Sequence, residues 1–87
     1  NLTACEGKFD LIVSNILFST LLQLSSTIVK KLKKNGSLVL SGILKSQAHL
    51  IKKKYLDVSK NTILLKEISS ESNWVCLAYF GNNQSGD

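Results

Sequence analysis

Apolar positions along the chain follow two alternating patterns, short continuous runs and runs with helical spacing. Residues 9–15 form an almost continuous apolar run, which predicts a strand buried on both faces. Across residues 16–33 the apolar side chains recur every three or four positions, which predicts an amphipathic helix of several turns. We expect this helix to end at Asn35 and Gly36, because glycine readily adopts the left-handed conformation that terminates helices.

The same two patterns repeat in the next part of the chain. Residues 37–42 predict a second buried strand that closes on a turn of small residues. A second helix follows, and its apolar face contains Leu44, Ala48, Ile51 and Tyr55. We expect Ser46 to cap this helix and the helix to end near Asp57.

Two further strands are predicted at the end of the sequence. Residues 62–68 and 74–80 have strand-like patterns, and the polar residues 69–73 between them suit a hairpin loop. The last strand carries apolar side chains on both faces, so we expect it to lie in the interior of the sheet.

The order strand, helix, strand, helix, strand, strand is typical of the α/β class. Helices of this length usually connect parallel strands, so the sequence predicts two strand-helix units followed by a terminal antiparallel hairpin. This arrangement is half of a doubly wound, Rossmann-like sheet. The first strand has no predicted neighbour on its outer edge, and we expect the chain to self-associate through that unpaired edge.

Length and composition limit the size and setting of this fold. A chain of 87 residues forms one small domain, which we expect over residues 1–80, with residues 81–87 as a polar, flexible tail. The sequence contains no methionine, so we expect a segment to be missing upstream. It has neither a long apolar run nor a secretion leader, which predicts a cytoplasmic protein that does not enter the membrane.

Lysine alone supplies the positive charge of the chain, whose formal net charge is +5. The absence of arginine argues against sequence-specific recognition of nucleic acids, because arginine makes the bidentate contacts to bases. Two clusters contain most of the lysines: Lys30, Lys31, Lys33 and Lys34, then Lys52, Lys53 and Lys54. Both clusters lie at predicted helix ends, where the helix dipole favours cations. They are either solvated surface or a weak contact site for a polyanion such as the ribosome.

Several common kinds of site are not predicted. Cys5 and Cys76 are far apart and His49 is the sole histidine, so we expect two free thiols and no metal site. No combination of serine, histidine and acid suggests a hydrolase. The sequence also contains neither a dinucleotide-binding glycine motif nor a P-loop.

Candidate site residues follow the first two strands, because ligands of open α/β sheets bind beyond the carboxyl ends of the strands. Asn15 follows the first strand, either as a helix N-cap or as an amide whose oxygen accepts a hydrogen bond from an amine or a cofactor. Gly42 follows the second strand, either as a turn residue or as a point where the backbone approaches a ligand. The spacing favours the turn.

Four stretches of the sequence resemble the C-terminal part of one known family. They are Phe9-Asp10-Leu11-Ile12-Val13-Ser14-Asn15-Ile16-Leu17, Asn35-Gly36, Leu40-Ser41-Gly42-Ile43-Leu44 with Gln47, and Trp74-Val75 with Leu77. In this order, over about residues 7–80, the sequence resembles the PrmA family of S-adenosylmethionine-dependent methyltransferases, which modify a bacterial large-subunit ribosomal protein.

The resemblance implies the C-terminal half of a class I methyltransferase fold. The glycine-rich cofactor loop and the acidic residue for the cofactor ribose belong to the other half of that fold, so the S-adenosylmethionine site in this chain is incomplete. The resemblance implies that Asn15 is a catalytic residue that also contacts the cofactor. It further implies that Asn15, the backbone carbonyl of Ile16, and Phe18 bind the methyl acceptor. PrmA proteins commonly have a small residue at the position of Phe18.

The implied function is N-methylation of lysine side chains and the N-terminal amine of that ribosomal protein, with this fragment inactive alone. Two alternatives remain open. One is a methyltransferase for a different acceptor, either glutamine or a nucleobase nitrogen. The other is a non-catalytic basic module that binds ribosomal RNA or protein through its lysines. Salt dependence separates the last alternative, because binding to a polyanion through several lysines weakens steeply with salt.

Overall fold

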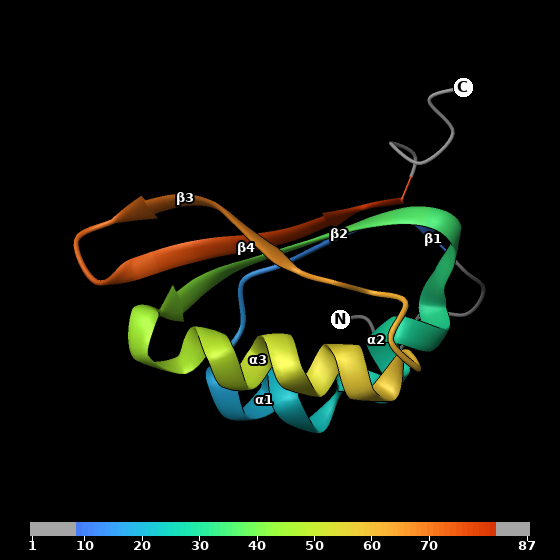
Figure 1. Cartoon of the computed structure of the whole chain (residues 1–87), viewed down its shortest axis with the longest axis horizontal. Helices are drawn as coiled ribbons and strands as arrows, with labels where there is room; N and C mark the ends of the chain where they lie inside the picture. The colour runs from blue at the N-terminus through green and yellow to red at the C-terminus, as the bar shows by residue number, and fades with distance from the viewer. Residues whose placement is uncertain (1–8, 82–87) are drawn as a thin grey trace.

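The predicted α/β architecture is confirmed by the structure, a computed structural model that describes residues 9–81 (Figure 1). Its elements are β1 (Phe9–Ser14), α1 (Phe18–Gln23), α2 (Ser25–Lys31), β2 (Leu32–Leu44), α3 (Lys45–Val58), β3 (Lys66–Glu71) and β4 (Trp74–Phe80). The strand order is β1-β2-β4-β3, in which β1 and β2 are parallel and the other pairs antiparallel. As expected, β4 is an interior strand, and β3 and β4 form the terminal hairpin.

The helix predicted over residues 16–33 is instead two short helices separated by Leu24. The Ser25 hydroxyl donates a hydrogen bond to the Leu22 carbonyl at 2.9 Å, within the junction between α1 and α2. Serine competes in this way with regular helical hydrogen bonding and often accompanies a bend. Leu21 of α1 and Ile28 of α2 are both buried, so the apolar stripe seen in the sequence still faces one core.

The end of this helical region also differs from the prediction. The helix α2 stops at Lys31, and β2 begins at Leu32, so Asn35 and Gly36 lie inside a strand. The left-handed conformation falls on Asn35, with a φ of 67°, and not on Gly36. Gly36 is needed for a different reason: a Cβ there would lie 2.9 Å from the Lys33 carbonyl oxygen. The strand β2 is therefore longer than the predicted 37–42.

The helix α3 agrees with its predicted apolar face and end, but not with its predicted cap. Ile51 and Tyr55 are buried, and the helix ends at Val58. Ser46 lies inside the first turn. Gln47 supplies the cap interaction instead, because its Oε1 accepts a hydrogen bond from the Leu44 backbone N–H at 3.0 Å.

The strand β3 begins at Lys66, four residues later than the prediction of residues 62–68. Residues 62–65 are irregular, although Ile63 and Leu65 are buried. The Ser59 hydroxyl oxygen accepts a hydrogen bond from the Ile63 backbone N–H at 2.9 Å, which fixes the chain after α3. At the hairpin, the expected loop of residues 69–73 contracts to a two-residue turn, because Glu71 pairs with Trp74.

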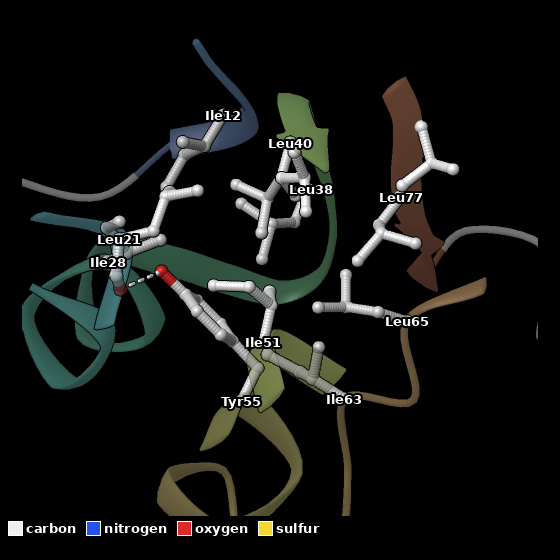
Figure 2. Close-up of a cluster of buried hydrophobic side chains, with 12 residues drawn as sticks. Ile12, Leu21, Ile28, Leu38, Leu40, Ile51, Tyr55, Ile63, Leu65 and Leu77 are labelled. Atoms are coloured by element: carbon white, nitrogen blue, oxygen red, sulfur yellow. Dashed lines mark hydrogen bonds between the residues drawn. The ribbon is translucent and has the colours of Figure 1, made fainter. Parts of the chain in front are cut away.

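The core lies between the sheet and the helices (Figure 2). Side chains of β1, β2, β4, the helices and the segment before β3 meet there: Ile12, Leu21, Ile28, Leu38, Leu40, Ile51, Tyr55, Ile63, Leu65 and Leu77. The Tyr55 side chain extends across this core, and its hydroxyl donates a hydrogen bond to the Leu21 carbonyl at 2.8 Å. Burial raises the pKa of Tyr55, because desolvation disfavours the phenolate.

The described helices all lie on one side of the sheet, and the opposite side is open (Figure 1). The prediction that β1 is buried on both faces is therefore wrong. Ile12 is buried, but Leu11 is 56% exposed and Val13 is 63% exposed. The prediction of an unpaired edge is confirmed for the described residues 9–81, among whose strands β1 is the outermost on its side of the sheet.

The two lysine clusters occupy different local positions. Lys30 and Lys31 lie in the last turn of α2, as predicted. Lys33 is in β2, where its Nζ lies 3.6 Å from the Asp10 Oδ1, and both side chains are too exposed for this pair to add much stability. The second cluster, residues 52–54, lies within α3 and not in its last turn, so that part of the prediction is wrong.

Three smaller predictions concern the cysteines and the C-terminal tail. Cys76 is a free, partly buried thiol, and Cys5 lies outside the described residues. Gly81 is buried, and the remainder of the predicted tail, residues 82–87, also lies outside the described part of the chain.

Candidate functional site

A pocket of about 940 Å³ lies at the carboxyl ends of β1 and β2, where the sequence predicted a ligand site. Five segments meet at it: the link from β1 into α1, the first turn of α1, the end of β2, the first turn of α3 and the start of β4. The lining residues are Asn15, Ile16, Leu17, Phe18, Ser19, Thr20, Gly42, Leu44, Gln47 and Trp74. The predicted residues Asn15, Ile16 and Phe18 are therefore brought together in one cavity.

Asn15 lies in the irregular link between β1 and α1, and its side chain is exposed. The N-cap of α1 is Leu17, two residues later, with no side-chain hydrogen bond. The interpretation of Asn15 as the helix cap is therefore wrong. Its amide is not used to begin the helix, and its oxygen can accept a hydrogen bond from a ligand.

Gly42 lies against the Asn15 side chain, inside a bulge of β2 and not in a turn after it. Its φ is +74°, a conformation that residues with a Cβ rarely adopt. A Cβ built on Gly42 would overlap the Asn15 Oδ1 and would lie 3.3 Å from the Asn15 Cγ. The close approach predicted for Gly42 as one of two alternatives does occur, but its neighbour is the amide of Asn15.

Apolar side chains form much of the remaining wall. Leu17 is 75% exposed and Trp74 is 51% exposed, both large fractions for such side chains, while Phe18 is partly buried. Leu44 contributes a further apolar surface, and Gln47 is held at the start of α3 by its hydrogen bond to the Leu44 N–H.

The described residues that line the pocket carry no formal charge. An amine that is covered by these apolar side chains on binding is favoured in its neutral form, because burial penalises the ammonium ion. The Asn15 amide oxygen can orient such an amine by accepting a hydrogen bond. The geometry therefore suits a ligand with an apolar stem and an uncharged nitrogen at its end.

Sequence reasoning placed Leu17 among the residues after the first strand, but it did not select Ser19, Thr20, Leu44, Gln47 or Trp74 as site residues. Gln47 and Trp74 belong to the stretches that carried the family resemblance, so their presence in those motifs was the available signal. The proximity of Trp74 to Asn15 depends on β4 running antiparallel to β2, which brings the start of β4 to the carboxyl end of β2. Only the sheet topology shows that placement.

The fold and the position of the pocket define this chain as part of a class I methyltransferase domain. A crystal structure of a ribosomal protein L11 methylase from Lactobacillus delbrueckii subsp. bulgaricus superposes with a TM-score of 0.73 and 32% sequence identity, covering 88% of this chain and 38% of that protein. A methyltransferase from Pyrococcus furiosus has the same fold, with a TM-score of 0.68 and 21% identity over 88% of this chain and 43% of that protein.

Residues 1–80 match the family described as ribosomal protein L11 methyltransferase (PrmA), and the chain belongs to this family. Curated relatives of that name include proteins from Campylobacter concisus and Ralstonia nicotianae, each 39% identical over 74 residues. These alignments cover 85% of this chain but only 25% and 24% of the two relatives. The chain thus spans about a quarter of the length of the curated relatives it matches.

A helix needs about 20 apolar residues to cross a lipid bilayer. None of the helices within residues 9–81 is both long enough and apolar enough to do so.

Proposed function

We propose that this chain forms the acceptor-binding end of an S-adenosylmethionine-dependent N-methyltransferase. Its substrates are lysine side chains and the N-terminal amine of a large-subunit ribosomal protein, which places the activity in the cytoplasm. The observation that carries the proposal is the uncharged pocket at the strand ends, with the Asn15 amide exposed in it, in a chain that belongs to the PrmA family. Relatives named ribosomal protein L11 methyltransferase support the choice of substrate.

The pocket fits the methyl-bearing end of the cofactor together with an acceptor side chain. Its volume of about 940 Å³ is near the upper end of the range of roughly 300–1,000 Å³ for ligand pockets, which leaves room for both. Asn15 and the backbone of Ile16 would contact the cofactor, and we assign its remaining contacts to residues outside this chain. S-adenosylmethionine, when bound, supplies an electrophilic methyl group.

The residues of this chain would act by aligning the acceptor. The Asn15 Oδ1 and the Ile16 carbonyl oxygen would accept hydrogen bonds from the amine N–H groups, which directs the nitrogen lone pair toward the methyl group. A bound S-adenosylmethionine would supply the methyl group to this nitrogen and would keep the electron pair of the broken carbon–sulfur bond on its sulfur. The product nitrogen then releases its proton to water through the open side of the pocket.

For the lysine acceptors, the apolar walls would contact the methylene stem, whereas the N-terminal amine would rely on the uncharged lining and on Asn15. Leu17, Phe18 and Trp74 offer surface to the four methylenes of a lysine side chain, while the uncharged lining favours the neutral amine that reacts. A glutamine amide is carried on only two methylenes, and a nucleobase nitrogen has no such stem. The pocket therefore favours an amine over glutamine or a nucleobase nitrogen as the acceptor.

Replacement of Asn15 tests this function. In the full-length protein, Asn15→Ala is expected to lower the rate of methyl transfer to the ribosomal protein by about 100-fold or more, because the amine is no longer aligned. Transfer of a radiolabelled methyl group measures the rate, and circular dichroism checks the fold. Gln23→Ala is the matched control, since Gln23 is an exposed amide at the end of α1 that does not line the pocket. A nearly normal rate for Asn15→Ala would remove Asn15 from the site.

A further inference from the structure

The strand β2 contains a bulge directly beside Asn15. Leu40 pairs with Leu77 and Ile43 pairs with Val75, so two residues of β2, Ser41 and Gly42, lie opposite the single residue Cys76. Bulges of this kind bend a strand locally and change the direction of nearby side chains. Here the bulge lies at the pocket end of β2, and Gly42 itself lines the pocket.

Because Gly42 has no side chain, the Asn15 amide can occupy the space beside it. A Cβ on Gly42 would overlap the Asn15 Oδ1, the atom proposed to accept the hydrogen bond from the amine. The bulge is held at its two ends, because Leu40 pairs with both β1 and β4 and Ile43 pairs again with β4, whereas Asn15 lies in an irregular link. An added methyl group on Gly42 would therefore displace the Asn15 side chain more readily than it would displace the strand.

Ser41, the other residue of the bulge, contacts the backbone just before Asn15. Its hydroxyl donates a long hydrogen bond of 3.4 Å to the carbonyl of Ser14, the residue before Asn15. Ser14 is also paired with Leu40 across the parallel strands β1 and β2. The backbone that leads into Asn15 is thus attached to β2 immediately before the bulge, and the amide meets β2 again at Gly42.

We propose that the bulge of Ser41 and Gly42 is the positioning element for Asn15, with Gly42 determining where the Oδ1 lies. Gly42 acts through Asn15 and does not itself contact the reacting atoms. The consequence for catalysis rests on the proposed function, whereas the coupling between Gly42 and Asn15 is a property of the fold. The two statements are tested separately.

Thermal stability tests the coupling without any assay of activity. The full-length protein is compared with Asn15→Ala, Gly42→Ala and the double variant. Gly42→Ala is expected to lower the melting temperature, because it adds both a steric overlap and an unfavourable φ. The double variant is expected to recover part of that decrease, since truncation of Asn15 removes the overlap. Additive effects of the two substitutions would overturn the proposal, because residues that do not interact show additive changes.

Gly36→Ala is the matched control for crowding of a glycine in the same strand. A Cβ on Gly36 would meet the carbonyl oxygens of Lys33 and Asp10, at 2.9 Å and 3.0 Å, and not Asn15. Gly36→Ala is expected to lower the melting temperature as well, but by an amount that does not change when Asn15 is replaced. Equal coupling of Gly36 and Gly42 to Asn15 would show a general effect on the strand and would contradict a specific role for Gly42.

Methyl-transfer kinetics test the consequence for catalysis. Gly42→Ala is expected to lower kcat by at least about tenfold with a smaller change in the KM for the acceptor, and to have no further effect on kcat once Asn15 is alanine. If the wild-type enzyme methylates the acceptor and Gly42→Ala has the same kcat, the positioning role is overturned. If the wild-type protein methylates no amine, the proposed function fails, while the melting temperatures still decide whether Gly42 and Asn15 are coupled.

Discussion

Among single residues, Tyr55 shows how one polar group is accommodated in an apolar core. Its ring is fully buried, and its hydroxyl donates a hydrogen bond to the Leu21 carbonyl that links α3 to α1 (Figure 2). Tyr55→Phe is expected to lower the free energy of unfolding by about 1 kcal/mol, the usual value for one internal hydrogen bond. Urea unfolding of the full-length protein measures this change. An unchanged midpoint would show that the hydrogen bond adds nothing to stability.

The raised pKa of Tyr55 also predicts a dependence of stability on pH. The unfolded chain loses the phenol proton near pH 10, while the folded chain retains it to higher pH. The contribution of Tyr55 is therefore fully present below about pH 10 and decreases as the pH rises above that value. The difference in unfolding free energy between the wild type and Tyr55→Phe should shrink over this interval. A constant difference would show that the phenol titrates equally in both states.

The contact between Asn15 and Gly42 marks the limit of what the sequence can predict at this scale. The position of Asn15 after an apolar run was sufficient to select it as a site residue, since strand ends bind ligands in this fold class. The contact of Gly42 with Asn15 depends on the lateral pairing of β1 and β2, which joins residues far apart along the chain. No local pattern reports such a contact.

Among the elements, the segment before β3 explains why the apolar pattern gave a wrong boundary. Ile63 and Leu65 are buried and Leu64 is exposed, which is the alternation of a strand. The chain there connects the end of α3 to the sheet, and within the described part of the chain its pairing with β4 begins only at Lys66. Periodicity reports which side chains are buried, but it does not report hydrogen-bond partners. The patterns of β4 and α3 were accurate because burial and pairing coincide in those elements.

The lysines of α3 allow a test of the alternative function as a polyanion-binding module. Lys53 and Lys54 are exposed, and neither they nor Lys52 line the pocket. If ribosomal RNA binds there, replacing all three by glutamine should weaken binding and reduce the logarithmic salt slope by about 0.7 to 0.9 for each phosphate that is no longer neutralised. Filter binding at several salt concentrations measures this slope. Lys66→Gln on β3 is the control, and an unchanged slope in the triple variant excludes this helix as the binding surface.

For the whole molecule, the two edges of the sheet differ in character. The strand β3 at one edge is exposed at every position and is mostly charged or polar, as expected of an edge protected against further pairing. The strand β1 at the other edge exposes Leu11 and Val13, which alternate with the buried Ile12 and therefore point away from the core. An apolar, unpaired edge next to an apolar face is the usual setting for association between chains.

The 87-residue chain, produced alone, is therefore expected to self-associate at micromolar concentrations through β1 and to bind S-adenosylmethionine weakly. Val13→Lys should shift the chain toward monomer, because a lysine on an edge strand opposes pairing with a second strand. Leu50→Lys is the matched control, since Leu50 is 45% exposed on α3, away from the sheet edge. Sedimentation velocity measures the distribution of species. A monodisperse wild-type monomer, or equal association of both variants, would show that the β1 edge does not drive assembly.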